Sequence, residues 1–202
     1  MSIAASHPGS VVTAPPNIMV IFGGSGDLTR RKLVPALYSL RKDGLLPDQF
    51  AVLALGRQDL GTDGLRAQLD EVSRKFLGED FDAQHWARVL ESVYYLQGDF
   101  TAAELFARLG ERLDELVEER GIAVNFLFYL ATPPQYFAGI TEQLGAAGLL
   151  QEGDGYWRRV VVEKPFGRDL ESAQALNRQL HSVLAEHQIY RIDHYLGKET
   201  VQ

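Results

Sequence analysis

The sequence predicts an α/β fold in which a doubly wound, mainly parallel sheet carries helices on both faces. The first observation is that short apolar segments rich in β-forming residues alternate with segments of helical periodicity along most of the 202-residue chain. The second is that the first apolar segment ends in a cluster of glycines, directly before a helical pattern begins. Because a parallel crossover needs room for a helix, strands that alternate with helices favour parallel pairing.

These patterns predict a series of strands and helices along the chain. Strands are expected at residues 18–22, 51–55, 93–96, 124–130, 159–162 and 189–192. Helices are expected at residues 27–43, 63–76, 82–90, 101–120, 134–147 and 170–187. In a sheet of this kind the ligand binds beyond the carboxyl ends of the strands, where the strand order reverses.

Two of the helices carry more specific predictions. Thr101 and Glu104 have the spacing of a capping box, at the start of the helix expected at 101–120. One apolar face of the first helix is expected to be buried, and it is formed by Leu28, Leu33, Ala36, Leu37 and Leu40.

The composition is that of a soluble globular protein, with 46% apolar and 23% charged residues. A net charge of -7 argues against broad nucleic-acid binding and against adhesion to anionic membranes. The absence of cysteine excludes disulfides, thiolate catalysis and cysteine-ligated zinc, and we expect no metal site. Since the sequence lacks both a signal-peptide pattern and an apolar run of about 20 residues, we expect a cytoplasmic protein without a membrane helix.

The first sixteen residues differ in composition from the rest of the chain. Residues 1–16 are rich in Ser, Ala, Pro and Gly, so we expect a flexible N-terminal tail. Residues 17–202 are expected to form a single domain.

The glycine cluster lies between the first strand and its helix. Gly23, Gly24 and Gly26 permit backbone conformations closed to other residues and let a phosphate approach the main chain. The start of the helix offers N–H donors and a partial positive charge, to which Ser25 adds a hydroxyl. Thr29 holds the third glycine position of the strict G-x-G-x-x-G pattern, and a tight turn alone would also explain the glycines. Their place at the first strand-to-helix junction favours a dinucleotide site in a Rossmann-type fold.

The end of the second strand indicates which dinucleotide is bound. NAD-specific sites usually place Asp or Glu here to hold the ribose hydroxyls, whereas this chain has Gly56, Arg57 and Gln58. A guanidinium can pair with a 2′-phosphate, which a carboxylate would repel. A solvated surface arginine is the alternative, and the position of Arg57 favours NADP.

Two further clusters follow the last two predicted strands. Glu163 and Lys164 end a buried strand, so the Lys164 ammonium faces the ligand crevice, or else the two side chains form an ion pair at the sheet edge. In the second cluster, His194, Tyr195 and Lys198 have the chemistry of a phosphate pocket. Asp193 would repel a phosphate and is better suited to orient a catalytic histidine.

Taken together, these motifs resemble the N-terminal domain of glucose-6-phosphate dehydrogenases. The matching segments occur in the family's order from about Asn17 onward, and the last two are the most specific. They are Gly23 to Leu28, Arg31 to Leu33, Gly56-Arg57, Glu163 to Gly167 and Arg191 to Glu199. The resemblance implies oxidation of the sugar C1 hydroxyl to a lactone with hydride transfer to NADP, with NAD as a less favoured alternative.

The resemblance also implies roles for individual residues. The coenzyme would be held by Gly23, Gly24, Ser25, Gly26, Asp27, Leu28, Arg57, Asp99, Phe100 and Lys164. Glucose 6-phosphate would be bound by His194, Tyr195 and Lys198, with Lys32 as a weaker candidate. Lys164 would lie between coenzyme and sugar, and Asp193 would pair with the general base.

The resemblance further implies what to expect of the chain as a whole. In the family the general base is a histidine of a second, mainly β-sheet domain, C-terminal to the region matched here. We therefore expect a coenzyme domain that ends before that second domain and turns over little substrate alone, whereas the full-length enzyme forms a homo-oligomer. The alternatives are a stand-alone NADP-binding regulatory module and another sugar or sugar-phosphate oxidoreductase.

Overall fold

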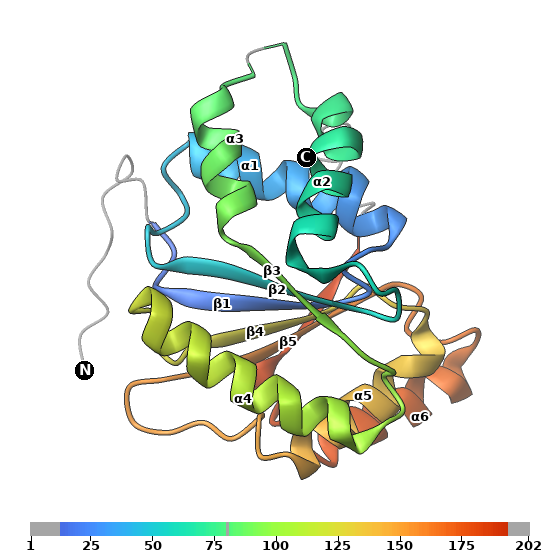
Figure 1. Ribbon diagram of the computed structural model, residues 1–202. Helices are drawn as coiled ribbons and strands as arrows, with labels where there is room; N and C mark the ends of the chain where they lie inside the picture. The colour runs from blue at the N-terminus through green and yellow to red at the C-terminus, as the bar shows by residue number, and fades with distance from the viewer. Residues whose placement is uncertain (1–12, 80, 194–202) are drawn as a thin grey trace, which may run out of the picture.

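The computed structural model describes residues 13–79 and 81–193, which form one six-stranded sheet covered by helices (Figure 1). The strand order is β3-β2-β1-β4-β5-β6, and each of the five neighbouring pairs is parallel. The doubly wound sheet expected from the sequence is confirmed, and it is parallel throughout the described residues. The strands are β1 (Asn17–Phe22), β2 (Phe50–Gly56), β3 (Val93–Gln97), β4 (Phe126–Leu130), β5 (Arg158–Glu163) and β6 (Ile189–Ile192).

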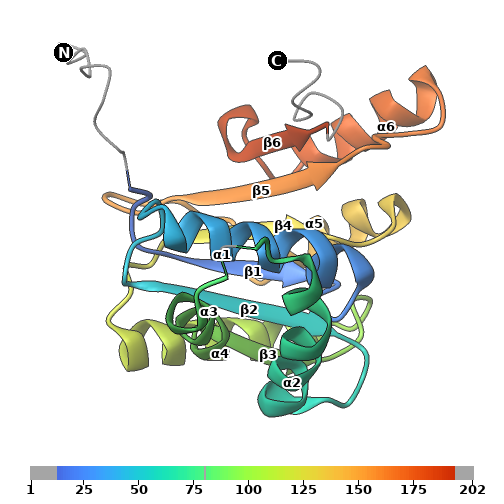
Figure 2. The same ribbon diagram turned by 90° about the horizontal axis from the view of Figure 1, so that it is seen from above.

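The helices cover the two faces of the sheet in two groups of three. One face carries α1 (Val34–Lys42), α2 (Gly61–Ser73) and α3 (Ala83–Glu91). The other carries α4 (Ala103–Arg120), α5 (Phe137–Ala146) and α6 (Leu170–His181). Figure 2, seen from the side of α1 to α3, shows that these three helices lie over the part of the sheet formed by β1 to β4, while β5 and β6 extend beyond them.

The apolar strands divide their side chains between two hydrophobic clusters. In β1 all six residues are buried. Ile18, Val20 and Phe22 pack toward α4 to α6, whereas Met19 and Ile21 pack toward α1 to α3. Burial of each large apolar side chain contributes about 1.5–3 kcal/mol, so the continuous apolar run of β1 suits a central strand with both faces covered.

The first helix differs from its predicted form. A π-helix, η1 (Thr29–Leu33), precedes α1, and the buried side chains of α1 include Val34, Leu37 and Tyr38. The prediction that Ala36 and Leu40 would be buried is therefore wrong, since both are exposed. A π-turn holds more residues than an α-turn, so it rotates the following helix relative to a regular 3.6-residue pattern.

The helix start predicted from a capping box is also wrong. α4 begins at Ala103, and its N-cap, Ala102, makes no side-chain capping bond. The Thr101 N–H and hydroxyl both donate to Asp99 Oδ1, at 2.9 Å each. Thr101 is thus engaged in a turn before the helix, because Asp competes for nearby backbone donors.

Three other helices, α2, α5 and α6, end or begin differently from their predicted ranges. α6 ends at His181 and is followed by the short 3₁₀-helix η4 (Glu186–Gln188), which leads into β6. α5 is preceded by the 3₁₀-helix η3 (Pro134–Tyr136), and α2 is followed by η2 (Arg74–Phe76). No helix among the described residues is both long and apolar enough to cross a membrane.

The last residues of the predicted tail contact the loop that follows α1. The Thr13 hydroxyl donates to the Gly44 carbonyl at 3.0 Å, and the Ala14 N–H donates to the Leu45 carbonyl at 2.9 Å. Hydrogen bonds to the loop after α1 therefore hold the chain in place from Thr13 onward, four residues before β1 begins.

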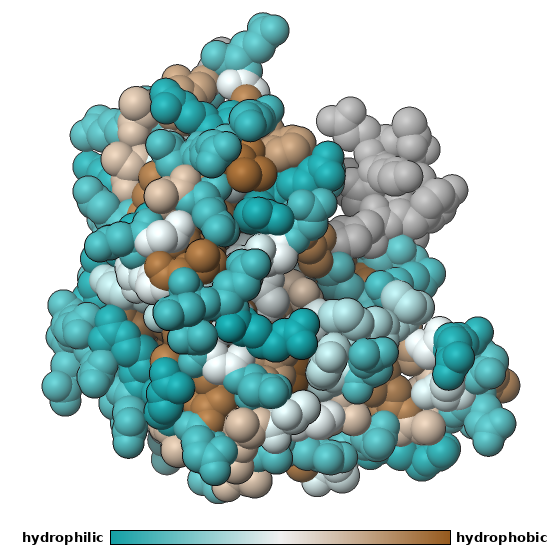
Figure 3. Space-filling view, turned by 45° about the vertical axis from the view of Figure 1, so that its right-hand side comes forward, coloured by the Kyte–Doolittle hydropathy of each residue, from teal (hydrophilic) through white to brown (hydrophobic). Residues whose placement is uncertain are grey.

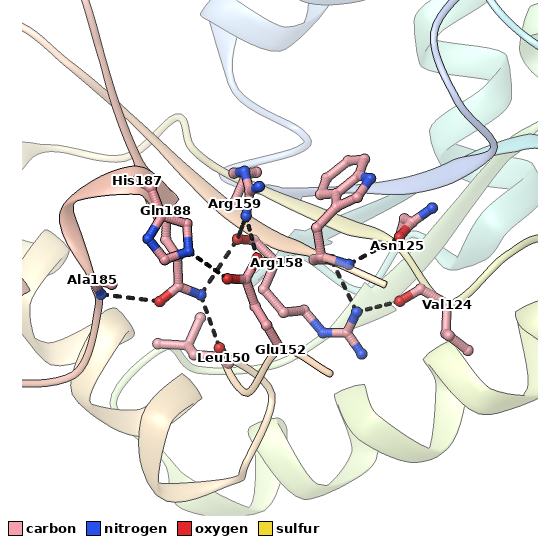
Figure 4. Close-up of polar contacts among 10 residues, drawn as sticks. Val124, Asn125, Leu150, Glu152, Arg158, Arg159, Ala185, His187 and Gln188 are labelled. Atoms are coloured by element: carbon pink, nitrogen blue, oxygen red, sulfur yellow. Dashed lines mark hydrogen bonds and ion pairs between the residues drawn. The ribbon is translucent and has the colours of Figure 1, made fainter. Parts of the chain in front are cut away.

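A polar network fastens the amino-terminal ends of β5 and β6 to the loop after α5 (Figure 4). The Glu152 carboxylate accepts hydrogen bonds from the Arg158 N–H at 2.9 Å and from the Arg159 guanidinium, and it contacts His187 Nε2 at 2.6 Å. Gln188 donates to the Leu150 carbonyl at 3.0 Å. Although partial burial opposes it, the Arg158 N–H, His187 and Arg159 together hold the pKa of Glu152 below its ordinary value.

We predict that Glu152→Gln destabilises the fold by about 1–2 kcal/mol at neutral pH, because the charge-assisted bonds of this network are lost. A carboxylate whose pKa is lowered by folding stabilises the fold above its unfolded pKa, and this effect is lost as pH falls through the folded value. The difference between wild type and variant should therefore shrink below pH 4.5, the ordinary pKa of glutamate. Urea unfolding across this range measures it.

Glu142→Gln is the matched control, since Glu142 is exposed on α5. It should change the free energy of unfolding by less than about 0.5 kcal/mol. Equal effects of the two substitutions would contradict a stabilising role for the network.

Candidate functional site

The main candidate site is a cleft of about 440 Å³ at the carboxyl ends of β1 to β4. Its walls come from the segments that follow these four strands, so it lies where the strand order reverses between β1 and β4. Figure 3 turns the side on which the strands end toward the viewer, and there apolar residues are interspersed with polar ones. The cleft is lined by Gly23, Ser25, Gly26, Gly56, Arg57, Asp99, Phe100, Thr101, Ala131, Thr132, Pro133, Gln135 and Tyr136.

Part of the glycine loop lines this cleft, and backbone hydrogen bonds hold the loop in place. The N–H groups of Gly23 and Gly24 both donate to the Leu55 carbonyl, at 3.0 and 2.8 Å, so the loop is tied to β2. The Gly23 carbonyl accepts from the Gly26 N–H at 2.9 Å and from the Thr29 hydroxyl at 3.1 Å. These bonds turn the chain sharply into the helix.

Gly23 is required by both conformation and space. Its φ of +89° lies in the left-handed region, which residues with a Cβ adopt at a cost. A Cβ built on Gly23 would stand 2.4 Å from the Ala131 carbonyl oxygen. The loops after β1 and β4 therefore approach so closely that a side chain at this position would collide with backbone.

Only part of the glycine motif lines the cleft. Gly23, Ser25 and Gly26 do, whereas Gly24 packs against Ala54 of β2, where a Cβ would lie 2.4 Å from the alanine Cβ. The other predicted members, Asp27 and Leu28, also lie outside the lining of the cleft. Asp27 pairs at the surface with Arg30 and Arg31, and Leu28 packs against the core under α1 to α3.

Arg57 and Asp99 form the wall at the ends of β2 and β3. Both residues are exposed, and both line the cleft with Phe100. The N–H and then the hydroxyl of Thr101 hold the pKa of Asp99 below its ordinary value, with a smaller contribution from the charge of Arg57. Arg57 directly follows β2, and Asp99 and Phe100 come shortly after the end of the neighbouring strand β3.

Tyr95 connects two cleft loops and has no sequence signal that would single it out. Its hydroxyl donates to the Gln58 carbonyl at 2.6 Å and also interacts with the Ser25 hydroxyl. Burial raises the pKa of Tyr95, although the Ser25 hydroxyl opposes this shift. A Cβ on Gly56 would lie 2.7 Å from the tyrosine oxygen, so Gly56 makes room for this contact.

The segment after β4 supplies the opposite wall, which the sequence analysis did not identify. Ala131 to Pro133, Gln135 and Tyr136 all line the cleft. A signal was present, because Ala131 directly follows a predicted strand, as the glycine loop and Arg57 do. The segment contains neither a charged residue nor a glycine, and it matches none of the motifs on which the predicted site is based.

A second group of predicted residues meets at the carboxyl ends of β5 and β6. Lys164 Nζ lies 2.6 Å from Asp193 Oδ2, with the lysine side chain 59% exposed and that of Asp193 22% exposed. The Lys164 N–H donates to the Ile192 carbonyl at 3.2 Å, and the Lys164–Pro165 peptide is cis. The two residues predicted to be catalytic are thus neighbours in space, although they are far apart in sequence.

Glu163 and Lys164 have different partners, since Glu163 contacts Tyr129 whereas Lys164 contacts Asp193. It is buried, and its carboxylate accepts a hydrogen bond from the buried Tyr129 hydroxyl. Burial, and then the nearby Glu163 carboxylate, raise the pKa of Tyr129. The phenol therefore stays protonated and remains a donor to Glu163.

The remaining predicted residues are placed only in part. Lys32 is exposed on η1 and does not line the cleft. His194, Tyr195 and Lys198, predicted to bind the sugar phosphate, lie outside the described residues. Within residues 13–79 and 81–193, no three His, Asp or Glu side chains are grouped so that they could hold a metal ion.

Comparison with known proteins gives a consistent result. Residues 20–202 match the family described as glucose-6-phosphate dehydrogenase, NAD binding domain. Over 184 residues the chain is 44% identical to glucose-6-phosphate 1-dehydrogenase 2 of Mycobacterium bovis, covering 91% of this chain and 36% of that protein. Over 193 residues it is 42% identical to the Chlamydia pneumoniae glucose-6-phosphate 1-dehydrogenase, covering 94% and 38%. The chain thus spans little more than a third of the length of these curated relatives.

Solved structures show the same similarity. A glucose-6-phosphate dehydrogenase in complex with its substrate glucose 6-phosphate is similar with a TM-score of 0.81 and 32% identity, over 94% of this chain and 39% of that one. A glucose-6-phosphate 1-dehydrogenase from Mycobacterium avium is similar with a TM-score of 0.77 and 39% identity, over 91% and 37%.

The close approach at Gly23 leads to a prediction. Gly23→Ala should destabilise the fold by about 1–2 kcal/mol for the left-handed backbone and by about 1–3 kcal/mol more for the collision with Ala131. Gly44→Ala is the control, because Gly44 also has a positive φ, +71°, but open space around its Cβ position. Chemical unfolding of both variants measures the difference. If both substitutions lower the free energy of unfolding equally, the close packing of the loops after β1 and β4 is contradicted.

Proposed function

The chain belongs to the glucose-6-phosphate dehydrogenase family through that family's NAD-binding domain, and on this premise we propose that it binds NADP as the coenzyme domain of a glucose-6-phosphate 1-dehydrogenase. The observation that supports this proposal most directly is that the glycine loop and Arg57 line the same cleft. This cleft lies where the strand order of the sheet reverses.

The lining of the cleft fits a phosphorylated dinucleotide. Gly23 and Gly56 leave room that a side chain would fill, and the helix start behind the loop favours the pyrophosphate. Arg57 supplies a guanidinium for the 2′-phosphate at the position where NAD-specific sites carry a carboxylate. Asp99 and Phe100 border the adenine side. NAD remains a less favoured coenzyme, since it lacks the phosphate that Arg57 would bind.

The proposed reaction is oxidation of glucose 6-phosphate at C1 to 6-phosphogluconolactone. Bound in the cleft, NADP would supply the acceptor for the hydride from the C1–H bond, and the C1 hydroxyl proton would pass to a general base. Lys164 lies between coenzyme and sugar, where its ammonium binds a substrate oxygen and is oriented by Asp193. His194, Tyr195 and Lys198 hold the sugar phosphate, with Lys32 as a further candidate. From the family resemblance we further propose that the parent enzyme acts in the pentose phosphate pathway, in the cytoplasm, as a homo-oligomer.

The described histidines lie away from the cleft. His85 lies 4.0 Å from Asp82, His181 contacts Glu186 at 2.9 Å, and His187 contacts Glu152 at 2.6 Å. None of these three imidazoles lines the cleft, so none is placed to take the C1 proton. The proposal therefore assigns NADP binding to the described residues and assigns proton removal to a residue outside them.

Arg57→Ala should abolish the preference for NADP over NAD. Loss of charge-assisted bonds to the 2′-phosphate should weaken NADP binding on the order of tenfold to a hundredfold and leave NAD binding nearly unchanged. Isothermal titration of wild type and variant with both dinucleotides measures this preference.

Arg108→Ala provides the control, because Arg108 is an exposed arginine of α4 outside the cleft and its loss changes the net charge equally. It should bind NADP as wild type does. Equal affinity of the wild-type chain for NADP and NAD would refute the assignment of Arg57.

The 202-residue chain mixed with NADP and glucose 6-phosphate should form little or no NADPH, since the described residues place no imidazole at the cleft. Absorbance at the NADPH band, followed at neutral pH, tests this expectation. Rapid turnover would show that a base has been overlooked within the chain.

A further inference from the structure

Thr132 carries a hydroxyl that the protein itself leaves without a partner. Among the described residues, seven buried side-chain nitrogen or oxygen atoms have no hydrogen-bond partner, and Thr132 Oγ1 is the one that belongs to a residue lining the cleft. Other buried threonines satisfy their hydroxyls. Thr29 donates to the Gly23 carbonyl at 3.1 Å, and Thr141 donates to the Phe137 carbonyl at 2.9 Å.

An unsatisfied buried hydroxyl destabilises the folded chain, because water is lost without replacement. Valine would fill the same space without this cost. A hydroxyl that is left without a partner inside a binding cleft is therefore better explained by a ligand than by the fold.

The position of Thr132 shows which part of a dinucleotide it can reach. It is the second residue after β4, and its Cγ2 would lie 3.5 Å from a Cβ built on Gly23. Arg57 and Asp99 lie on the other wall, at the ends of β2 and β3. Since a dinucleotide spans the switch point with one mononucleotide on each side, Thr132 faces the half opposite the adenosine.

We propose that Thr132 is a coenzyme-binding residue whose hydroxyl donates a hydrogen bond to the pyrophosphate or ribose of the nicotinamide half. This inference rests on the proposed binding of NADP. In the unliganded chain the hydroxyl is shielded from solvent. Rotation about χ1 to another staggered position is the movement by which it would reach the coenzyme. Binding of the coenzyme then supplies the partner that the protein lacks.

The test compares Thr132→Val, which removes the hydroxyl at constant shape, with Thr132→Ser, which keeps it. Isothermal titration of each variant uses NADP and adenosine 2′,5′-bisphosphate, which lacks the nicotinamide half. Thr132→Val should weaken NADP binding about fivefold to tenfold, as expected for one lost hydrogen bond. Thr132→Ser should stay within about twofold of wild type, and all three proteins should bind the bisphosphate equally.

Thermal unfolding without ligand gives a second test, because a ligand-binding role and a structural role of the hydroxyl predict opposite changes in the melting temperature. Thr132→Val should raise the melting temperature of the unliganded chain, because it removes an unsatisfied buried hydroxyl. A structural role for the hydroxyl predicts that the same substitution lowers it.

Three results would overturn the inference while leaving the proposed function intact. They are NADP binding by Thr132→Val at wild-type affinity, an equal loss of binding for NADP and the bisphosphate, and a lower melting temperature for the unliganded variant. Failure of the wild-type chain to bind NADP at all would instead overturn the proposed function, and the inference with it.

Discussion

The pairing of β1 with β2 on one side and with β4 on the other is the constraint on which the rest of the molecule depends. Because the chain crosses from β3 back past β1 to form β4, the helices that follow β1 and β4 lie on opposite faces of the sheet, and the cleft lies at the carboxyl ends of these strands. The glycine loop after β1 is hydrogen-bonded to the Leu55 carbonyl of β2 and lies against Ala131 after β4. The cleft is therefore a consequence of strand order, and the loop residues determine what it can bind.

The carboxyl ends of β5 and β6 lie at the same edge of the sheet as the cleft, and they carry a second group of predicted site residues. Register places Glu163 opposite Ile192, so the residues that follow, Lys164 and Asp193, meet in an ion pair. The buried Tyr129–Glu163 contact joins β4 to the end of β5, while the Glu152 network fastens the opposite ends of β5 and β6. Polar contacts thus fix both ends of β5, and Lys164 directly follows this strand.

Much of this arrangement follows from local patterns that the sequence displays. Apolar runs predict the buried strands, and the glycines after β1 predict a tight turn. Arg57 is identified as a candidate coenzyme residue by its position directly after β2. Other features depend on contacts between distant segments. Tyr95 is an ordinary strand residue until the fold brings it to Ser25, and the hydroxyl of Thr132 is unsatisfied only because of what surrounds it. The π-turn before α1 and the engagement of Thr101 by Asp99 are local, but they compete with patterns that predict regular helices.

The most direct test of the account is a titration of the isotopically labelled chain with NADP, followed by the backbone amide signals in nuclear magnetic resonance. We expect the largest changes in the segments that line the cleft at the ends of β1 to β4, which are Gly23 to Gly26, Arg57, Asp99 to Thr101 and Ala131 to Tyr136. Changes concentrated elsewhere, for example around Glu152 and His187 at the opposite ends of the strands, with the cleft signals unmoved, would contradict it.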